Sequence, residues 1–213
     1  MAMPKQVLVV VTSTIEYPDG SPTGFWLSEV THPYFHFIES GWQVAFASIS
    51  GAALADEGSV EDAKNNKDVK TMEFWEDEEK KALLESAFQL GGEGTPPVEE
   101  LVTQYDVVYF AGGYGSMWDF PTCEPAAALV KAMHAAGKVV AAVCHGPIIF
   151  GGITLDDETK VPPTPSASCS PRLSHAHSLI RLHPRLCLRL RAVARWQGVH
   201  GLHQSRGDQD GQV

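Results

Sequence analysis

The chain has 213 residues, which is enough for one domain with a sizeable hydrophobic core. Its net charge of −10 argues against nucleic acid or an anionic membrane as a partner of the whole chain, because either would repel an acidic surface. Its four cysteines lack a C-x-x-C spacing, and its apolar start is too short for a secretory signal, so we expect a cytoplasmic protein with reduced thiols. No stretch approaches the roughly 18 consecutive apolar residues of a membrane helix.

Four short apolar runs are typical of strands that are covered on both faces of a sheet. They are QVLVVVT at 6–12, WQVAFAS at 42–48, DVVYFAG at 106–112 and VVAAV at 139–143. Helical patterns lie between them, at 24–40 with an interruption at Pro33, at 74–88, and at 125–137 with Gly137 as the C-terminal cap. Alternating strands and helices predict an α/β fold, with a mostly parallel sheet and helices on both of its faces.

In such a sheet, reactive groups gather at the carboxyl ends of the strands. The loops that follow the four predicted strands are TSTIEYPDGSPTG, SISGAALADEG, AGGYGSMWDF and CHGP. Glycine and cysteine concentrate in these loops, so we expect the functional site there.

Residue usage changes near the C-terminal end of this pattern. Residues 1–163 contain nine Lys, no Arg and 24 acidic residues, whereas 164–213 contain seven Arg, no Lys and two acidic residues. The alternation of strands and helices also fades from residue 156, and several prolines follow. We therefore predict two parts, a domain at 1–155 and a basic tail at 156–213.

Two interpretations of the predicted tail are open. Residues 185–197 match a short basic amphipathic helix, which would suit RNA, an acidic partner or a membrane surface. The favoured interpretation is a tail without a selected fold. A change of reading frame or an unspliced junction near 155–164 would produce such a switch.

Cys144 stands where the strand at 139–143 ends, and its position also has two interpretations. The next element would be a helix that begins near Gly146 and Pro147, whose free N–H groups and positive potential favour thiolate over thiol. A cysteine that ends a strand is otherwise a packed core residue. The strand, the Cys144-His145 pair, the Gly-Pro step and the helix together favour a nucleophile.

A thiolate that attacks a carbonyl needs donors for the oxyanion and a group that moves protons. Gly112 and Gly113 follow a neighbouring strand, so their backbone N–H groups would face the same crevice, unless they form a plain tight turn. Glu29 lies in the otherwise apolar segment TGFWLSEVTHPYF. Burial there would raise its pKa and suit it to proton transfer, whereas a helical glutamate is ordinarily solvated.

Glu29, His32 and His36 also have the spacing of a ligand cluster on adjacent helix faces. Because Pro33 would disrupt that register, we expect no metal at these residues.

Three stretches in order resemble the ThiJ/PfpI superfamily, which has the class I glutamine amidotransferase-like (flavodoxin-like) fold. They are TGFWLSEVTHPYFHFIESGWQVAFAS with ALADEGSVEDA, then AGGYGSMWDFP, then AAVCHGP. The likeness runs from about residue 5 to about 155. It is strongest to the chaperone-like branch that contains the glutathione-independent glyoxalase III enzymes.

This resemblance implies that Cys144 is the nucleophile, that His145 is its neighbour in the site, and that Glu29 is placed against the sulfur. It further implies an oxyanion pocket made by the turn of Gly112 and Gly113 and by the backbone of Gly146.

The implied reaction is that of a lyase of the lactate dehydratase type. A small 2-oxoaldehyde, methylglyoxal, becomes lactate through a cysteine hemithioacetal and an enediol, without metal or cofactor. In the family this reaction serves carbonyl detoxification and the stress response, and members often form dimers.

The resemblance ends after Leu155. Members of the branch continue with a glycine-rich turn, another strand and a Thr-Gly-Phe segment whose acidic residues include one that orients the histidine. The fold is thus expected to be incomplete on its C-terminal side, and an inactive truncated member, a stress chaperone or a redox-sensing thiol protein is the alternative. A glutamine amidotransferase is disfavoured because no late His-x-Glu follows the cysteine, and a cysteine peptidase rests on the fold alone.

Overall fold

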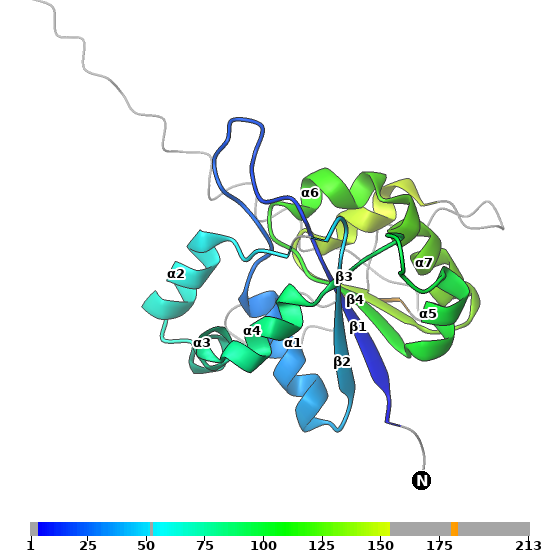
Figure 1. The fold of residues 1–213 in the computed structure, drawn as a ribbon, viewed down its shortest axis with the longest axis horizontal. Helices are drawn as coiled ribbons and strands as arrows, with labels where there is room; N and C mark the ends of the chain where they lie inside the picture. Colours follow the sequence, from blue (N-terminus) through cyan, green and yellow to red (C-terminus); the bar gives the residue numbers. More distant parts are fainter. Residues whose placement is uncertain (1–3, 52, 154–179, 183–213) are drawn as a thin grey trace, which may run out of the picture.

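The computed structural model describes residues 4–51, 53–153 and 180–182, and within them one sheet has the strand order β3-β2-β1-β4-β5-β6 (Figure 1). Five of its strands are parallel, and β6 runs antiparallel to β5. The strands are β1 (Gln6–Val11), β2 (Gln43–Ser48), β3 (Phe88–Gln89), β4 (Val107–Phe110), β5 (Val139–Ala142) and β6 (Ile180–Leu182). The predicted α/β fold with a mostly parallel sheet is confirmed.

All four predicted strands are present, as β1, β2, β4 and β5. Two further strands escaped the sequence analysis because they have two and three residues, too few for a recognisable pattern. The backbone of β6 adds an edge strand from within the predicted tail. The rest of the tail prediction, including the possible helix at 185–197, lies outside the described residues.

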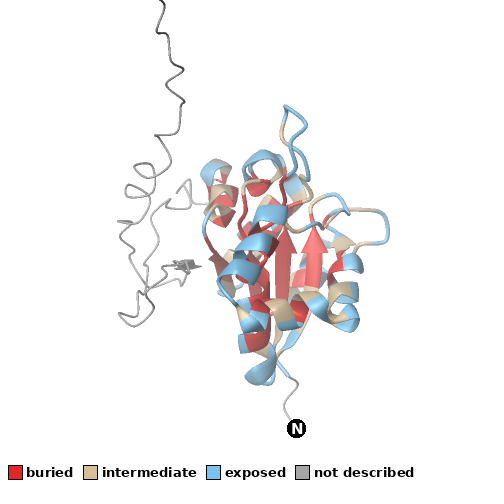
Figure 2. Cartoon of the chain, turned by 90° about the vertical axis from the view of Figure 1, so that its left-hand side faces the viewer, coloured by how far each residue is buried: buried red, intermediate tan, exposed pale blue. Residues whose placement is uncertain are grey.

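Helices cover both faces of the sheet, with α1 to α4 on one side and α5 and α7 on the other (Figure 1). The α-helices are α1 (Ser28–Glu39), α2 (Glu57–Asn65), α3 (Val69–Glu76), α4 (Glu78–Glu85), α5 (Val98–Gln104), α6 (Ser116–Asp119) and α7 (Glu124–Ala135). Two short 3-10 helices, η1 (Phe120–Thr122) and η2 (Gly146–Gly152), complete the list. Figure 2 shows the buried strands between helices whose outer surfaces are exposed.

The predicted interruption of the first helix at Pro33 is wrong, because α1 continues through this residue. Proline has no N–H, so the carbonyl of Glu29, four residues earlier, loses its helical donor. The hydroxyl of Tyr109 on β4 donates to that carbonyl at 2.8 Å. The helix therefore stays intact because the sheet supplies the missing hydrogen bond.

The single helix predicted at 74–88 is also wrong. Asp77 has an extended backbone (φ −90°, ψ 111°) that separates α3 from α4. Its carboxylate accepts hydrogen bonds from the N–H groups of Glu79 and Lys80 and so caps α4. The capping aspartate divides one charged, periodic stretch into two helices.

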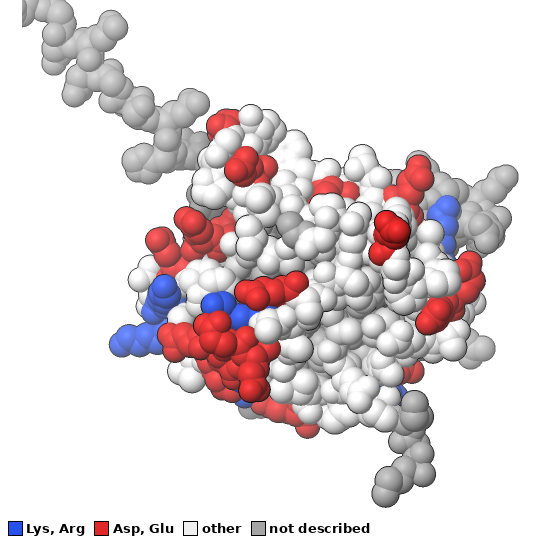
Figure 3. Space-filling view, in the orientation of Figure 1, with Lys and Arg blue, Asp and Glu red and all other residues white. Residues whose placement is uncertain are grey.

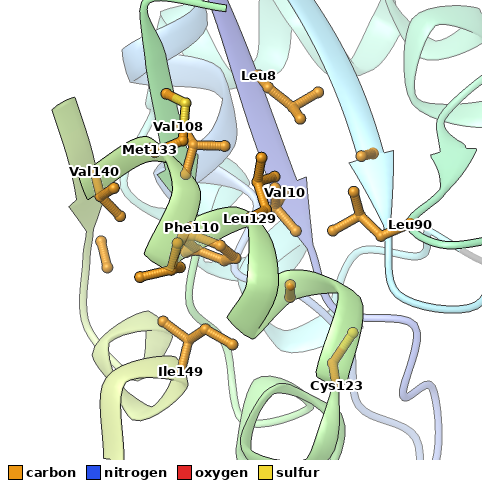
Figure 4. Packing of buried hydrophobic residues seen from close by; sticks show 14 of the residues in the cluster. Leu8, Val10, Leu90, Val108, Phe110, Cys123, Leu129, Met133, Val140 and Ile149 are labelled. Carbon is orange, nitrogen blue, oxygen red and sulfur yellow. The ribbon is translucent and has the colours of Figure 1, made fainter. Parts of the chain in front are cut away.

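The core consists of two apolar layers, one on each face of the sheet. Alternate residues of β1 serve the two layers: Leu8 and Val10 face α7, whereas Val7 and Val9 face α1. Figure 4 shows the first layer, in which Leu8, Val10, Val108 and Phe110 pack with Leu129 and Met133 of α7. Full burial of one such side chain stabilises the fold by roughly 1.5–3 kcal/mol. The strands are continuously apolar because helices cover the sheet on both of its faces.

Acidic side chains outnumber basic ones on the face seen in Figure 3 and gather near α3 and α4. This distribution agrees with the acidic composition of the N-terminal part of the chain. Among the helices that the structure describes, none combines the length and the apolar character needed to cross a membrane.

Candidate active site

The candidate site lies at the carboxyl edge of β4 and β5, where the chain turns sharply at Cys144. The backbone of Cys144 is left-handed (φ +54°), a conformation that costs a residue with a side chain roughly 1–3 kcal/mol. The Gly146 N–H donates to the Val143 carbonyl at 2.7 Å and closes the turn. A strained turn between a strand and a helix presents a nucleophile in many hydrolases, and Cys144 has this geometry.

Gly146 brings this turn against the neighbouring strand. A Cβ atom at position 146 would lie 2.5 Å from the Phe110 carbonyl oxygen, so no other residue fits without moving backbone. The close approach holds Cys144 beside the end of β4. The predicted helix after Cys144 is present as the 3-10 helix η2 rather than as an α-helix.

Glu29, in the first turn of α1, is buried against this edge, with 4% of its surface exposed. The Gly112 N–H donates to Glu29 Oε2 at 2.8 Å, and the Cys144 thiol lies close enough to act on the same carboxyl group. Burial raises the pKa of Glu29 to about 7, although the Gly112 N–H and the Cys144 thiol act in the opposite direction. The predicted burial of Glu29 is confirmed, and its effect on the pKa has the expected direction.

The thiol of Cys144 differs from the sequence expectation. The residue as a whole is exposed, yet its sulfur lies close enough to Glu29 and to the adjoining backbone to lose hydration. This desolvation, together with the negative charge of Glu29, raises the pKa of Cys144 to about 12, while the N–H groups of His145 and Gly113 lower it in part. The carboxylate and the loss of water outweigh the short helix, so the resting thiol keeps its proton.

Glu29 and Cys144 are therefore two acids that share one site and ionise in succession. The first proton leaves near pH 7 and the second only at strongly alkaline pH. Between these limits, the pair carries one negative charge and one proton. Transfer of that proton from sulfur to carboxylate would create the thiolate.

The structure gives the three predicted pocket glycines different hydrogen bonds. The N–H of Gly112 is directed to Glu29 and that of Gly146 to Val143, so neither is free to bind an oxyanion in this arrangement. The N–H groups that face the sulfur are those of Gly113 and His145. The geometry thus favours Gly113 and His145 as backbone donors, with Gly112 and Gly146 as close-packing positions.

The turn that carries Gly113 fits tightly against the loop before α1. A Cβ on Gly113 would lie 2.4 Å from the Gly24 carbonyl oxygen and 2.6 Å from the Trp26 nitrogen. Its φ of +107° also lies in the region that favours glycine. The Trp26 N–H donates to the Gly112 carbonyl at 3.1 Å and fastens the two loops together.

His145 lies directly beside the nucleophile, with its Nδ1 atom 3.3 Å from Cys144 Sγ. Burial lowers the pKa of its imidazole, so the ring is neutral at physiological pH. The ring of Tyr114 lies against the imidazole, with the ring centroids 4.7 Å apart. A neutral imidazole at this distance can accept a proton from the thiol, and its ring N–H can donate a hydrogen bond to a bound substrate.

The predicted metal candidates do not converge. Glu29 is buried at the sheet edge, whereas His32 is exposed and contacts Asp68 with its Nε2 atom at 2.8 Å. His36 is exposed as well. Among the residues that the structure describes, no group of three or more His, Cys, Asp or Glu side chains is placed to hold a metal ion.

Two tyrosines of the site were missed by the sequence analysis. Tyr109 is fully buried and positions Glu29 through its carbonyl, and Tyr114 contacts His145. A hydroxyl within the apolar run VVYF of β4 was a usable signal for Tyr109, since a buried hydroxyl requires a partner. No sequence signal distinguished Tyr114 from an ordinary turn residue.

Comparison with known proteins gives one family match. A sequence model of the DJ-1/PfpI family matches residues 21–157. Glutathione-independent glyoxalase HSP31 of Saccharomyces cerevisiae is 33% identical over 162 residues, which cover 75% of this chain and 65% of the yeast protein. Glyoxalase 3 of Candida albicans is 31% identical over 162 residues, 74% of this chain and 64% of that protein. The chain therefore spans less than two thirds of the length of these relatives.

Solved structures resemble the chain over a similar extent. The rapid encystment protein 24 kDa of Francisella tularensis has a TM-score of 0.64 at 30% identity, over 74% of this chain and 66% of that one. Glyoxalase III of Candida albicans has a TM-score of 0.53 at 26% identity, over 74% of this chain and 62% of that one.

Proposed function

Because the chain belongs to the DJ-1/PfpI family, we propose that it is a glutathione-independent glyoxalase that converts methylglyoxal to lactate. One observation carries the proposal. The strained Cys144 has its sulfur beside Glu29, a buried carboxyl group whose pKa is about 7 and whose charge acts on the thiol. A thiol beside a proton acceptor of that strength suits addition to an aldehyde near neutral pH.

In the first step, the Cys144 sulfur adds to the aldehyde carbon of methylglyoxal, and the C–S bond forms. The Glu29 carboxylate takes the thiol proton as the sulfur attacks, which avoids a free thiolate. The aldehyde oxygen gains the negative charge in front of the Gly113 and His145 N–H groups. The same proton then passes to that oxygen, which gives a neutral hemithioacetal and a carboxylate again.

In the second step, Glu29 removes the hydrogen of the former aldehyde carbon, and the electron pair moves to the ketone oxygen. The hydroxyl proton of the former aldehyde carbon passes to that oxygen. As a carbonyl re-forms on the former aldehyde carbon, the neighbouring carbon takes back the proton held by Glu29. One carbon is oxidised and the other reduced, so no external oxidant or reductant is required. The product is a lactyl thioester of Cys144, and water cleaves its C–S bond to release lactate and the thiol.

The direct test is lactate formation from methylglyoxal in the absence of glutathione. We expect activity in the wild type, with a loss of at least about a thousandfold in Cys144→Ala and in Glu29→Gln. Cys123→Ala is the matched control, because Cys123 is a buried core cysteine away from Glu29. A wild type as inactive as Cys144→Ala would refute the proposal.

The pH dependence of activity tests the same pair. The rate is expected to rise with pH through about 7, as Glu29 loses its proton and becomes able to accept that of Cys144. Any residual activity of Glu29→Gln should lack this rise.

A non-catalytic thiol protein, such as a stress chaperone or redox sensor, is the second candidate. The raised pKa of Cys144 favours the chaperone over the redox sensor, since oxidation requires a thiolate and a thiol that keeps its proton is a poor nucleophile without its base. Suppression of client aggregation by both the wild type and Cys144→Ala, without lactate formation, would support this candidate.

We propose further that residues 1–155 form the working domain, to whose sheet the segment 156–213 adds the edge strand β6, and that the protein removes reactive carbonyls in the cytoplasm under stress. Mass spectrometry of the native protein tests the first statement through peptides from 172–206. Translation of the coding DNA beyond codon 155 in the other two frames tests it independently, because a family-like continuation there would identify a frame change. The second statement is tested by the cellular location of the protein and by the methylglyoxal sensitivity of cells that lack it.

A further inference from the structure

We propose that Tyr114 is a positioning residue that holds the His145 imidazole against Cys144. The inference deepens the proposed function and rests on it for the catalytic consequence. The contact between the two rings and the rigidity of the Tyr114 turn carry the argument.

The His145 imidazole has contacts with Cys144 and with Tyr114. Its Nδ1 atom is 3.3 Å from Cys144 Sγ, and its ring centroid is 4.7 Å from that of Tyr114, with an angle of 35° between the planes. Rings at this separation and tilt are in van der Waals contact. Rotation of the imidazole away from the sulfur would therefore change its packing against the tyrosine.

Tyr114 projects from a turn that has almost no freedom to move. The glycines on both of its sides have no room for a side chain, since a Cβ on Gly113 would lie 2.4 Å from the Gly24 carbonyl oxygen. One on Gly115 would lie 2.5 Å from the Thr14 carbonyl oxygen. The buried Ser116 hydroxyl also donates to the Gly113 carbonyl at 2.8 Å. Preorganised support of this kind is what a positioning residue requires.

Several charged or polar groups surround the ring pair. Cys144 faces the imidazole, while Tyr17, Cys144 and Asp56 act electrostatically on Tyr114. Tyr17 lies with its ring centroid 6.5 Å from that of Tyr114. Loss of water lowers the pKa of His145, and we expect the Tyr114 ring, which lies against the imidazole, to add to this loss.

The ring and the hydroxyl of Tyr114 can be separated by substitution. Tyr114→Phe keeps the ring and should behave as the wild type, whereas Tyr114→Leu removes the aromatic surface. We expect Tyr114→Leu to raise the pKa of His145 toward its ordinary value of about 6.5 and to lower kcat for methylglyoxal about ten- to a hundredfold, with little change in KM. Tyr17→Leu removes the ring that neighbours Tyr114 and leaves the Tyr114–His145 pair in place, so it should change both quantities much less than Tyr114→Leu does.

The primary measurement is the titration of the His145 imidazole by NMR, with the signal assigned through its loss in His145→Gln. The pH profile of Cys144 alkylation by iodoacetamide provides a second readout, which also does not depend on turnover. If the wild type titrates and alkylates as expected but forms no lactate, the proposed function fails and the positioning role stands.

Two results would overturn the positioning role. One is a Tyr114→Leu protein with the titration and alkylation profile of the wild type. The other is a Tyr114→Phe protein that behaves like Tyr114→Leu, because the hydroxyl and not the ring would then be responsible. Thermal melting reports whether each variant folds, and Tyr114→Gln replaces Tyr114→Leu in the same comparison should the latter not fold.

Discussion

The two edges of the sheet both contain glycines, but for different physical reasons. At the carboxyl edge, a Cβ on Gly112 or Gly146 would lie 2.7 or 2.5 Å from an oxygen of Glu29 or Phe110. At the amino edge, Gly41 and Gly137 have a φ of +78° and +66°, with nothing within 4 Å of an added Cβ. Glycine thus permits close packing where the site lies and permits a turn of the chain where it does not.

The two ends of β1 also differ in the number of hydrogen bonds that an aspartate accepts there. Asp119 accepts hydrogen bonds at one oxygen from the Thr12 hydroxyl and from the N–H groups of Ser13 and Thr14, all beyond the carboxyl end of the strand. Asp106 accepts a single hydrogen bond, from the Gln6 N–H, at the amino end. Several hydrogen bonds hold the carboxyl edge together at once. Substitutions there should therefore lower the free energy of unfolding by more than matched substitutions at the amino edge.

The largest effect is expected for Gly146→Ala. The added methyl group meets the Phe110 carbonyl, which belongs to a central strand and cannot move cheaply. We expect a loss of about 3 kcal/mol in the free energy of unfolding, together with a disturbed Cys144 turn. Urea unfolding and the rate of Cys144 alkylation measure the two consequences. A loss no larger than that of Gly137→Ala would remove the contrast between the edges.

Glu29→Gln should remove a pH-dependent part of the free energy of unfolding that is nearly as large as the loss expected for Gly146→Ala. The folded protein binds the Glu29 proton more tightly than the unfolded chain does, since the pKa rises from 4.5 to about 7. The resulting stabilisation is fully present below about pH 4.5 and is lost as the pH rises through 7, by about 3 kcal/mol at 1.36 kcal/mol per pH unit. Urea unfolding at pH 5 and pH 8 should show a larger decline in the wild type than in Glu29→Gln. Equal declines would mean that the burial of Glu29 does not govern its protonation.

Asp119→Ala should cost more than Asp106→Ala. The first change leaves three donors without their acceptor, although it also removes Oδ1, a buried oxygen that has no hydrogen-bond partner among the described residues. We expect about 2 kcal/mol for Asp119→Ala and about 1 kcal/mol for Asp106→Ala. Urea unfolding of the two variants at one pH gives the comparison, which equal losses would contradict.

The smallest effect is expected for Gly137→Ala, at the end of α7. Only the left-handed backbone opposes the change, so the cost should be about 1 kcal/mol, and Gly137→Asn should cost less. Thermal melting measures both variants. Alkylation of Cys144 should keep its wild-type rate, and a slower rate would show that the amino edge influences the site.

Much of the fold was predictable because its signals are local. The runs at 6–12, 42–48, 106–112 and 139–143 match β1, β2, β4 and β5 to within a few residues, since doubly covered strands are apolar throughout. The failures had causes outside the local pattern. Pro33 reads as a helix breaker unless Tyr109 is known to lie beside it, and Asp77 reads as one more surface charge unless its backbone is known to be extended.

The candidate site also combines features with a local sequence signal and features that depend on tertiary contacts. The position of Cys144 at a strand end and the apolar surroundings of Glu29 are written in the sequence. The direction of the Cys144 pKa was predicted wrongly, because the helix terminus is a local feature whereas the Glu29 charge reaches the sulfur through space. The N–H groups of Gly112 and Gly146 were expected in the pocket and have other acceptors, which no sequence pattern specifies.

The sequence by itself determined the α/β architecture, and it predicted the edge of the sheet where the candidate site lies and the cysteine and carboxylate proposed for it, because these follow from periodicity and from residue type. Only the tertiary structure decided which groups meet: Glu29 with Cys144, Tyr109 with the carbonyl that Pro33 leaves free, and Tyr114 with His145. Hydrogen bonds and desolvation depend on distances between segments that are far apart in the chain. Proton affinity and ring packing are therefore properties of the folded arrangement.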